Sequence, residues 1–194
     1  MNVVERAKKL ILEPQHEWQA INAESHGVQE LFTGYVMVLA AIPAVASFIG
    51  LSIVGIGPFG STYRVPLGAG VAHLMAVYLL SLGAVYLLAL VFEGLSPKFE
   101  GKRDFGQALK VATYFPTPAW LAGVFNVIPA LWIIGFFLSL YSLYLLFLAL
   151  PKFMSIPESK AIPYLAVVFM ALLIICVVIY IAVGLTLPSK VRGF

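Results

Sequence analysis

The placement of charge constrains this chain most, because four long stretches carry no charged side chain. Lys110 and Lys152 enclose 41 consecutive uncharged residues, 111–151. The other windows run over residues 31–63, 65–92 and 161–189. A hydrocarbon core about 30 Å thick requires roughly 20 apolar residues for one spanning helix. Every window is long enough to cross a bilayer, so the sequence predicts an all-α fold, a polytopic membrane helix bundle.

Composition agrees with this prediction and limits the alternatives. The chain is 61% hydrophobic and 11% charged, whereas soluble domains are about 25% charged. The longest polar stretches, Met1–Glu30 and Glu93–Lys110, are too short for a large water-soluble domain. Cys176 is the single cysteine, which excludes a disulfide framework and a cysteine-based metal site.

Residues 1–30 are predicted to be a cytoplasmic N-terminal segment and not a signal peptide. A signal peptide needs a basic start followed by an unbroken apolar run of about 7–15 residues, and here charged and apolar residues alternate. Apolar residues recur at helical spacing at Val3, Val4, Ala7, Leu10 and Ile11. After Pro14, Trp18 and Ile21 form a second short apolar face. We expect two amphipathic helices lying in the headgroup region; the alternative is a mobile polar tail.

The membrane domain is predicted to cover residues 31–187 in five spans. As one helix, residues 111–151 would be about 60 Å long, twice the membrane thickness. The sequence Asn126-Val127-Ile128-Pro129 can turn the chain near the middle of this window. The predicted spans are therefore residues 31–53, 66–92, 108–127, 130–150 and 163–187, followed by a short tail at 188–194.

The distribution of basic residues predicts the orientation. With five spans, nine of the 12 Lys and Arg residues lie on the N-terminal side. Only Arg64, Lys190 and Arg192 lie on the other side. By the positive-inside rule, the N-terminus is cytoplasmic and the C-terminus lies on the opposite side of the membrane. Merging the third and fourth spans gives the same charge ratio. Helix length, and not charge, therefore decides between four and five spans.

Small residues four apart mark candidate helix contacts. Gly68, Ala72 and Ala76 share a face of the second span, and Ala46 and Gly50 share one in the first. Such faces let helix backbones approach closely in lipid. They are compatible with a homo-oligomer or a membrane-protein partner in addition to the lipid bilayer.

The inventory of catalytic and ligand-binding motifs is nearly empty. His16, His26 and His73 are scattered, and no metal-binding or phosphate-binding motif accompanies them. His73 is expected to form a hydrogen bond between helices. We expect no enzymatic activity, no cofactor, no metal and no nucleic-acid partner.

Charged residues stand only at the ends of the predicted spans. Arg64 and Glu93 flank the second span. A coupled transporter usually has a carboxylate near the bilayer midplane, and none is present, which counts against coupled transport. Arg64 either holds a lipid phosphate or only marks the membrane boundary.

The segment Tyr114–Trp120 departs from ordinary spanning helix, because Pro116 and Pro118 lie two residues apart. Proline leaves helix carbonyls without donors, and lipid offers none. The segment is either a broken helix forming a cytoplasmic-side pocket, with Lys110 at its rim, or a kink with Trp120 as an interface anchor.

Tyrosine hydroxyls supply further polar groups in the fourth span. Tyr141 and Tyr144 share one helix face at i, i+3. Together with the proline break, they motivate a second functional hypothesis, a passive channel or lipid-handling protein.

Several segments, in order, resemble the bacterial branch of the Yip family, the Ypt- or Rab-interacting membrane proteins. The matching segments are Pro14-x-x-x-Trp18-x-x-Ile21-x-x-Glu24, Tyr63-Arg64-Val65-Pro66-Leu67-Gly68, Leu95-Ser96-Pro97-Lys98-Phe99, Gln107-Ala108-Leu109-Lys110, Tyr114-x-x-x-Pro118-Ala119-Trp120-Leu121-Ala122-Gly123, and Tyr141-x-x-Tyr144-Leu145-Leu146 before Leu150-Pro151.

The resemblance implies a five-span protein of a bacterial inner membrane, with a cytoplasmic N-terminus and a periplasmic C-terminus. Eukaryotic members act in vesicle trafficking with Rab-type GTPases and in shaping membranes. Their longer N-terminal region is reduced here to about 30 residues. The first hypothesis is therefore a non-enzymatic integral membrane protein that organises membrane or partner proteins.

Overall fold

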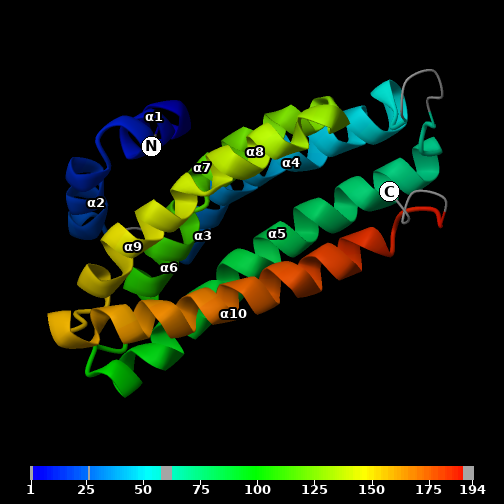
Figure 1. The fold of residues 1–194 in the computed structure, drawn as a ribbon. Helices are drawn as coiled ribbons and strands as arrows, with labels where there is room; N and C mark the ends of the chain where they lie inside the picture. Colours follow the sequence, from blue (N-terminus) through cyan, green and yellow to red (C-terminus); the bar gives the residue numbers. More distant parts are fainter. Residues whose placement is uncertain (1, 26, 58–62, 190–194) are drawn as a thin grey trace.

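The computed structural model describes residues 2–25, 27–57 and 63–189, and helices account for most of them. Figure 1 shows α5 and α10 side by side, facing a second group that contains α4, α7 and α8. The two N-terminal helices lie at one end of the bundle, and α10 ends at the opposite end. The all-α prediction is confirmed. The predicted tail beyond Ser189, His26 and residues 58–62 lie outside the described residues.

The N-terminal segment folds into two helices, α1 (Val3–Leu12) and α2 (Pro14–Ala23), here called the N-terminal hairpin. The Asn2 side chain caps α1 by accepting from the backbone N–H groups of Val4 and Glu5. Pro14 occupies the first position of α2, where its missing N–H removes no helical hydrogen bond.

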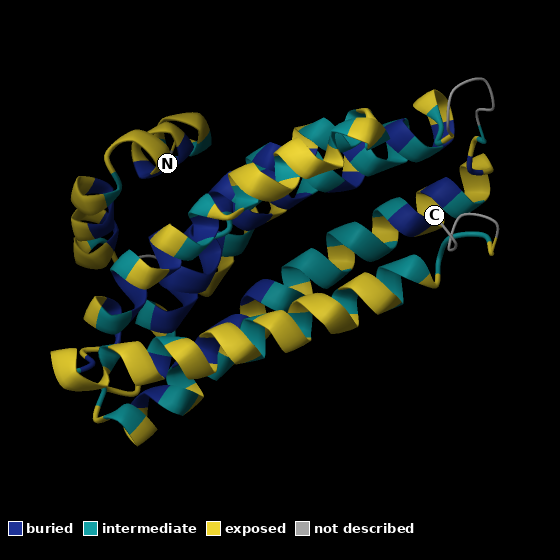
Figure 2. Ribbon diagram, in the orientation of Figure 1, coloured by how far each residue is buried: buried dark blue, intermediate teal, exposed yellow. Residues whose placement is uncertain are grey.

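The apolar face of the hairpin packs against the bundle. Leu10, Trp18 and Ile21 are at most 4% exposed. Figure 2 shows the buried inner face and the exposed outer face of both helices. The sequence analysis expected Leu10 and Trp18 among lipid headgroups. In the structure protein covers them, because α1 packs against α2 and α7, and α2 packs against α6 and α9.

The first predicted span forms one continuous helix over Val28–Val54. It consists of α3 (Val28–Leu31), η1 (Phe32–Val36), α4 (Met37–Phe48) and η2 (Ile49–Val54), of which η1 and η2 are π-helical. The second span is α5 (Leu67–Leu95), extended by the short helix η3 (Ser96–Phe99). Pro66 directly precedes α5.

The last span, α10 (Glu158–Gly184), begins five residues before the predicted start at Pro163. Among its residues only Tyr164 and Val168 are buried. Figure 2 shows the remainder exposed or partly exposed along its whole length. An apolar helix so little covered by protein is suited to contact lipid.

The predicted third span, residues 108–127, is divided in the structure. α6 (Phe105–Tyr114) ends before Pro116, α7 (Thr117–Ala122) begins after it, and η4 (Gly123–Val127) follows. The chain then turns at Ile128 into η5 (Pro129–Leu131), α8 (Trp132–Ser139) and α9 (Tyr141–Phe153).

Four helical stretches are long and apolar enough to cross a membrane: Val28–Val54, Leu67–Phe99, Pro129–Phe153 and Glu158–Gly184. The 105–127 segment is not among them, because the two prolines interrupt it. A crossing by this segmented helix, and hence the total of five spans, stays a prediction.

Two glycines allow the first span to pack tightly against the segmented helix. A Cβ at Gly50 would overlap the carbonyl oxygen of Asn126, and one at Gly123 would overlap Pro43. The Ala46–Gly50 face predicted from the sequence is therefore buried within the chain. Gly68 and Ala72, from the other small-residue face, are exposed.

Candidate functional site

A partly buried arginine, Arg6, fastens the N-terminal hairpin together. The Arg6 guanidinium donates to Glu17 Oε1 at 2.6 Å and to both carboxylate oxygens of Glu24, at 2.6 and 2.7 Å. The side chains of Arg6 and Glu17 are each 10% exposed. Charge-assisted hydrogen bonds of this kind are stronger than neutral ones, so Arg6 ties α1 to both ends of α2.

The electrostatics of Arg6 favour its charged form. Burial opposes the charge, but the hydrogen bond to Glu24 and the negative charges of Glu17 and Glu24 outweigh burial and raise the pKa of the guanidinium. Its carbon also lies 5.8 Å from the centroid of the Tyr114 ring, within range for a cation–π interaction. Arg6 therefore stays charged throughout the physiological pH range.

Lys110 joins the hairpin to α6. Its Nζ donates to the backbone carbonyl oxygens of Asn22, at 3.2 Å, and Glu24. These carbonyls belong to the C-terminal end of α2, where a cation is favoured by the helix dipole. The sequence analysis expected Lys110 at the rim of a pocket; it is only 6% exposed, beneath the hairpin.

An aromatic cluster lies under the hairpin. The Trp18 ring is edge-on to Tyr114 and Phe153, with centroid separations of 6.5 and 5.4 Å. The Tyr114 ring in turn packs against the Tyr35 ring, with 4.7 Å between their centroids. Trp18 thus packs on the last residues of α6 and α9, which explains why it is not available to the membrane surface.

The helix break between α6 and α7 is internally hydrogen-bonded. Thr117 Oγ1 donates to the carbonyl oxygen of Tyr114 at 2.6 Å. Since this uses the single hydroxyl proton of Thr117, Tyr35 donates its own at 2.8 Å to Thr117 Oγ1. Pro118 has no backbone N–H to donate to the Tyr114 carbonyl oxygen four residues earlier, and the Thr117 hydroxyl takes the place of that donor.

Apolar cavities lie on both sides of the break. A cavity of about 630 Å³ is lined by Pro118, Leu121, Phe125 and Tyr141, among others. A second, of about 440 Å³, is lined by Pro116 and Trp120 together with residues of α5 and α10. The walls of both cavities are mostly apolar, and Lys110, expected at the rim of a pocket here, lines neither of them.

Comparison with known proteins gives the family. The Yip1 domain profile matches residues 8–180. The chain belongs to the Yip1 domain family. The inner membrane protein YohC of Escherichia coli K12 is 26% identical over 160 residues, covering 80% of this chain and 82% of YohC. YohC of Escherichia coli O6:H1 strain CFT073 matches to the same extent. No solved structure gives a significant match.

The structure of this Yip1 protein brings some of the predicted site residues together. Trp18, Glu24, Lys110 and Tyr114 meet between the hairpin and α6. Pro116, Pro118 and Trp120 follow at the break. Tyr141 reaches the hairpin by donating to the Ile11 carbonyl oxygen at 3.0 Å, and its ring lies 5.4 Å from that of Tyr144.

Arg64 and Glu93 do not join this site. Arg64 is exposed and precedes α5, at the other end of that helix from Glu93. Glu93 pairs with the exposed Arg103 at 3.4 Å. His73, expected to bridge helices, lies with its Nδ1 3.1 Å from Thr186 Oγ1. No group of three His, Cys, Asp or Glu residues capable of holding a metal occurs in the described part of the chain.

The sequence analysis missed Arg6, Glu17 and Tyr35. A usable signal was present in α2, where Glu17 and Glu24 are seven residues apart and so share a face with Ile21. Two carboxylates on the apolar face of a helix require a cation, and Arg6 was the candidate next to the apolar residues of α1. Tyr35 gave no signal, because its partner is 82 residues away.

Proposed function

We propose that this Yip1 protein is non-enzymatic and organises membrane or partner proteins at the cytoplasmic face of the inner membrane. The observation that carries the proposal is the docked N-terminal hairpin, fixed by Arg6, Glu17 and Glu24 and joined to the bundle by Lys110. A polar helical unit held rigidly on a membrane bundle serves as a binding surface without needing chemistry of its own.

The outer face of the hairpin supports a docking role. Val4, Lys8 and Leu12 are exposed and lie at i, i+4 and i+8 on one face of α1. An exposed stripe of mixed apolar and basic character suits a protein partner or a second copy of this chain. Because the hairpin is already ordered, binding there loses little conformational entropy.

The proposed orientation places the N-terminus in the cytoplasm and the C-terminus in the periplasm. Nine of the 12 Lys and Arg residues lie on the hairpin side if five spans are counted. The position of the hairpin and the end of α10 at opposite ends of the bundle supports an odd number of crossings.

Photo-crosslinking in living cells tests the proposal. A crosslinking amino acid at Lys8 should give discrete protein adducts, whereas one at Tyr180, which is 80% exposed on α10, should give mainly lipid. Combining the Lys8 probe with Arg6→Met, which releases the hairpin, should reduce the adducts at least severalfold. Absence of protein adducts at Lys8, or adducts indifferent to Arg6→Met, would contradict the proposal.

A second candidate function is passive conduction or lipid handling. It is supported by the two apolar cavities beside Pro116 and Pro118. Proteoliposomes containing the purified protein, an entrapped dye and a labelled lipid would distinguish the candidates. Dye release or lipid flipping that is lost in Pro116→Ala/Pro118→Ala favours this second function; neither activity is expected for an organising protein.

A further inference from the structure

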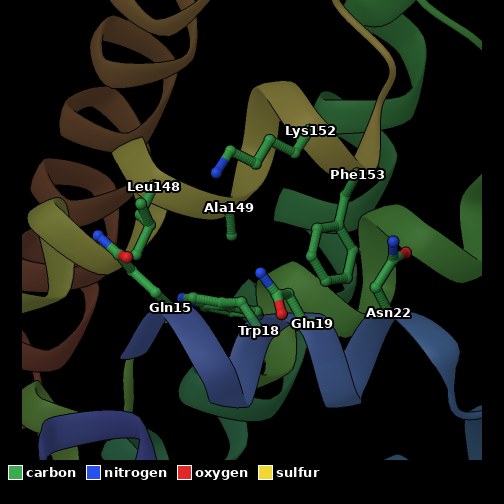
Figure 3. A pocket seen from close by; sticks show the side chains of 8 residues that line it. All are labelled: Gln15, Trp18, Gln19, Asn22, Leu148, Ala149, Lys152 and Phe153. Atoms are coloured by element: carbon green, nitrogen blue, oxygen red, sulfur yellow. The ribbon is translucent and has the colours of Figure 1, made fainter. Parts of the chain in front are cut away.

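A small pocket lies between α2 and the C-terminal part of α9, where apolar side chains such as Leu148 and Phe153 stand beside several polar ones. Its volume is about 140 Å³, roughly ten times the 10–15 Å³ that one water molecule requires. Figure 3 shows side chains of α2 on one side and of α9 on the other. The polar residues lining it are Gln15, Trp18, Gln19, Asn22 and Lys152.

The polar side chains of this pocket have no partners in the described protein. Gln15, Gln19, Asn22 and Lys152 are exposed residues whose side chains make no hydrogen bond or ion pair with another described residue, so they are free to meet a ligand at the rim. Trp18 is 4% exposed, yet its indole Nε1 has no hydrogen-bond acceptor. A buried N–H without an acceptor is unfavourable, and this one belongs to a residue that lines the pocket.

The unpaired groups describe the chemistry of a ligand. Lys152 is a cation, Trp18 is a donor only, and the three amides each offer an NH₂ group. No carboxylate lines the pocket, and the nearby acids Glu17 and Glu24 are paired with Arg6. The complementary ligand is therefore an anion that accepts several hydrogen bonds, as phosphate oxygens do.

The surroundings favour a lipid as the source of this phosphate. Lys152 lies in the last turn of α9, on the side that charge placement assigns to the cytoplasmic headgroups, where basic residues attract anionic lipids. Tyr141, eleven residues earlier on the same helix and about 16 Å away along its axis, lines the apolar cavity of about 630 Å³. α9 thus lines both the pocket that contains Lys152 and, further along its length, the apolar cavity beside Tyr141.

We propose that the pocket between α2 and α9 binds the phosphate of an anionic phospholipid of the phosphatidylglycerol type, with an acyl chain along α9 toward the apolar cavity. Lys152 neutralises the phosphate, and Gln15, Gln19 and Trp18 donate to its oxygens. The headgroup hydroxyls donate to the amide oxygens. This site is separate from the proposed docking stripe on α1.

Native mass spectrometry of the full-length protein tests the assignment. Protein from nanodiscs of equal phosphatidylcholine and phosphatidylglycerol should retain phosphatidylglycerol preferentially. Lys152→Gln should reduce that retention roughly fivefold, and Lys152→Arg should preserve it. Lys98→Gln removes an exposed lysine on the same proposed side and should leave retention unchanged. Equal losses in Lys152→Gln and Lys98→Gln would overturn the site, because they indicate only general surface attraction.

Nuclear magnetic resonance of the Trp18 indole N–H separates lipid from soluble phosphate. The resonance, assigned through its loss in Trp18→Phe, should shift on addition of phosphatidylglycerol and stay in place with phosphatidylcholine. Inorganic phosphate at millimolar concentration should cause little shift. An equal response to inorganic phosphate, or no response to phosphatidylglycerol, would overturn the lipid assignment.

Discussion

At the scale of single residues, the site contains polar groups that would destabilise the protein interior if they had no partners. Arg6 is balanced by Glu17 and Glu24, and Lys110 by carbonyl oxygens at the end of α2. Removing one partner of a buried pair leaves the other charge without compensation, which is costlier than removing both. The effect expected of each substitution therefore depends on whether it leaves a buried charge without a partner.

Arg6→Met should loosen the hairpin by about 2–3 kcal/mol, because it leaves the Glu17 carboxylate buried and unpaired. Amide hydrogen exchange in α1 and α2 should accelerate while exchange in α5 stays slow. Adding Glu17→Gln should recover part of the protection. Lys9→Met removes an exposed pair with Glu5 and should leave amide exchange in α1 and α2 unchanged. An equal effect of both methionine variants would argue against a stabilising role of the ion pairs of Arg6.

Tyr35→Phe should destabilise the bundle by about 1 kcal/mol, since Thr117 loses a donated hydrogen bond. Thr117→Val should destabilise it more, because the Tyr114 carbonyl and the Tyr35 hydroxyl both lose their partner. Thermal unfolding in detergent measures both changes. Tyr180→Phe, at an exposed position on α10, is the matched control and should unfold like the wild type.

At the scale of helices, the main event is the break in the segment 105–127. The sequence predicted a bend from Pro116 and Pro118, and the structure places the boundary between α6 and α7 there. The sequence did not predict the separate helix η4 or the close approach of η4 to Gly50, because contacts between distant segments leave no local pattern.

Pro116→Ala with Pro118→Ala should straighten this segment while expression is preserved. Spin labels at Gln107 and Val124, in a Cys176→Ser background, would report the change. A continuous helix would place the two backbones about 25 Å apart along its axis, and the double variant should move toward that value. An unchanged distance would mean that packing, and not proline, imposes the break.

Gly50→Ala should destabilise the bundle by about 1–3 kcal/mol, because its Cβ would overlap backbone atoms of Asn126. Gly83→Ala is the matched control, with open space around its Cβ position in α5. It should be neutral or stabilising by up to about 1 kcal/mol. Denaturant resistance in detergent compares the two variants.

At the scale of the whole molecule, uncharged windows were sufficient to predict a polytopic bundle, because lipid imposes its length on every spanning helix. The role of the hairpin was not predictable in the same way. An apolar stripe containing Leu10 and Trp18 has the same pattern whether it faces headgroups or protein. Only the long-range contacts of Lys110, Tyr141 and Phe153 distinguish the two environments.

The topology prediction belongs to this scale. A reporter fused after Phe194 should behave as periplasmic, and one fused at the N-terminus as cytoplasmic, because the prediction is that five crossings separate the two ends. Paired fusions that are active in opposite compartments provide the measurement. Cytoplasmic activity of the C-terminal fusion would mean that the segment 105–127 enters the membrane without crossing it.

The docking of the hairpin also has a consequence for biosynthesis. The ion pairs within the hairpin join residues no further apart than Arg6 and Glu24, so α1 and α2 can pair as soon as Glu24 has been made. Phe153, whose ring packs against Trp18, is synthesised 129 residues after Glu24. At ordinary bacterial elongation rates this takes roughly 6–26 s. During that interval Leu10 and Trp18 face the ribosome exit site, the insertion machinery and the nascent helices. The hairpin is therefore made long before the α9 residue that it packs against, and it docks late.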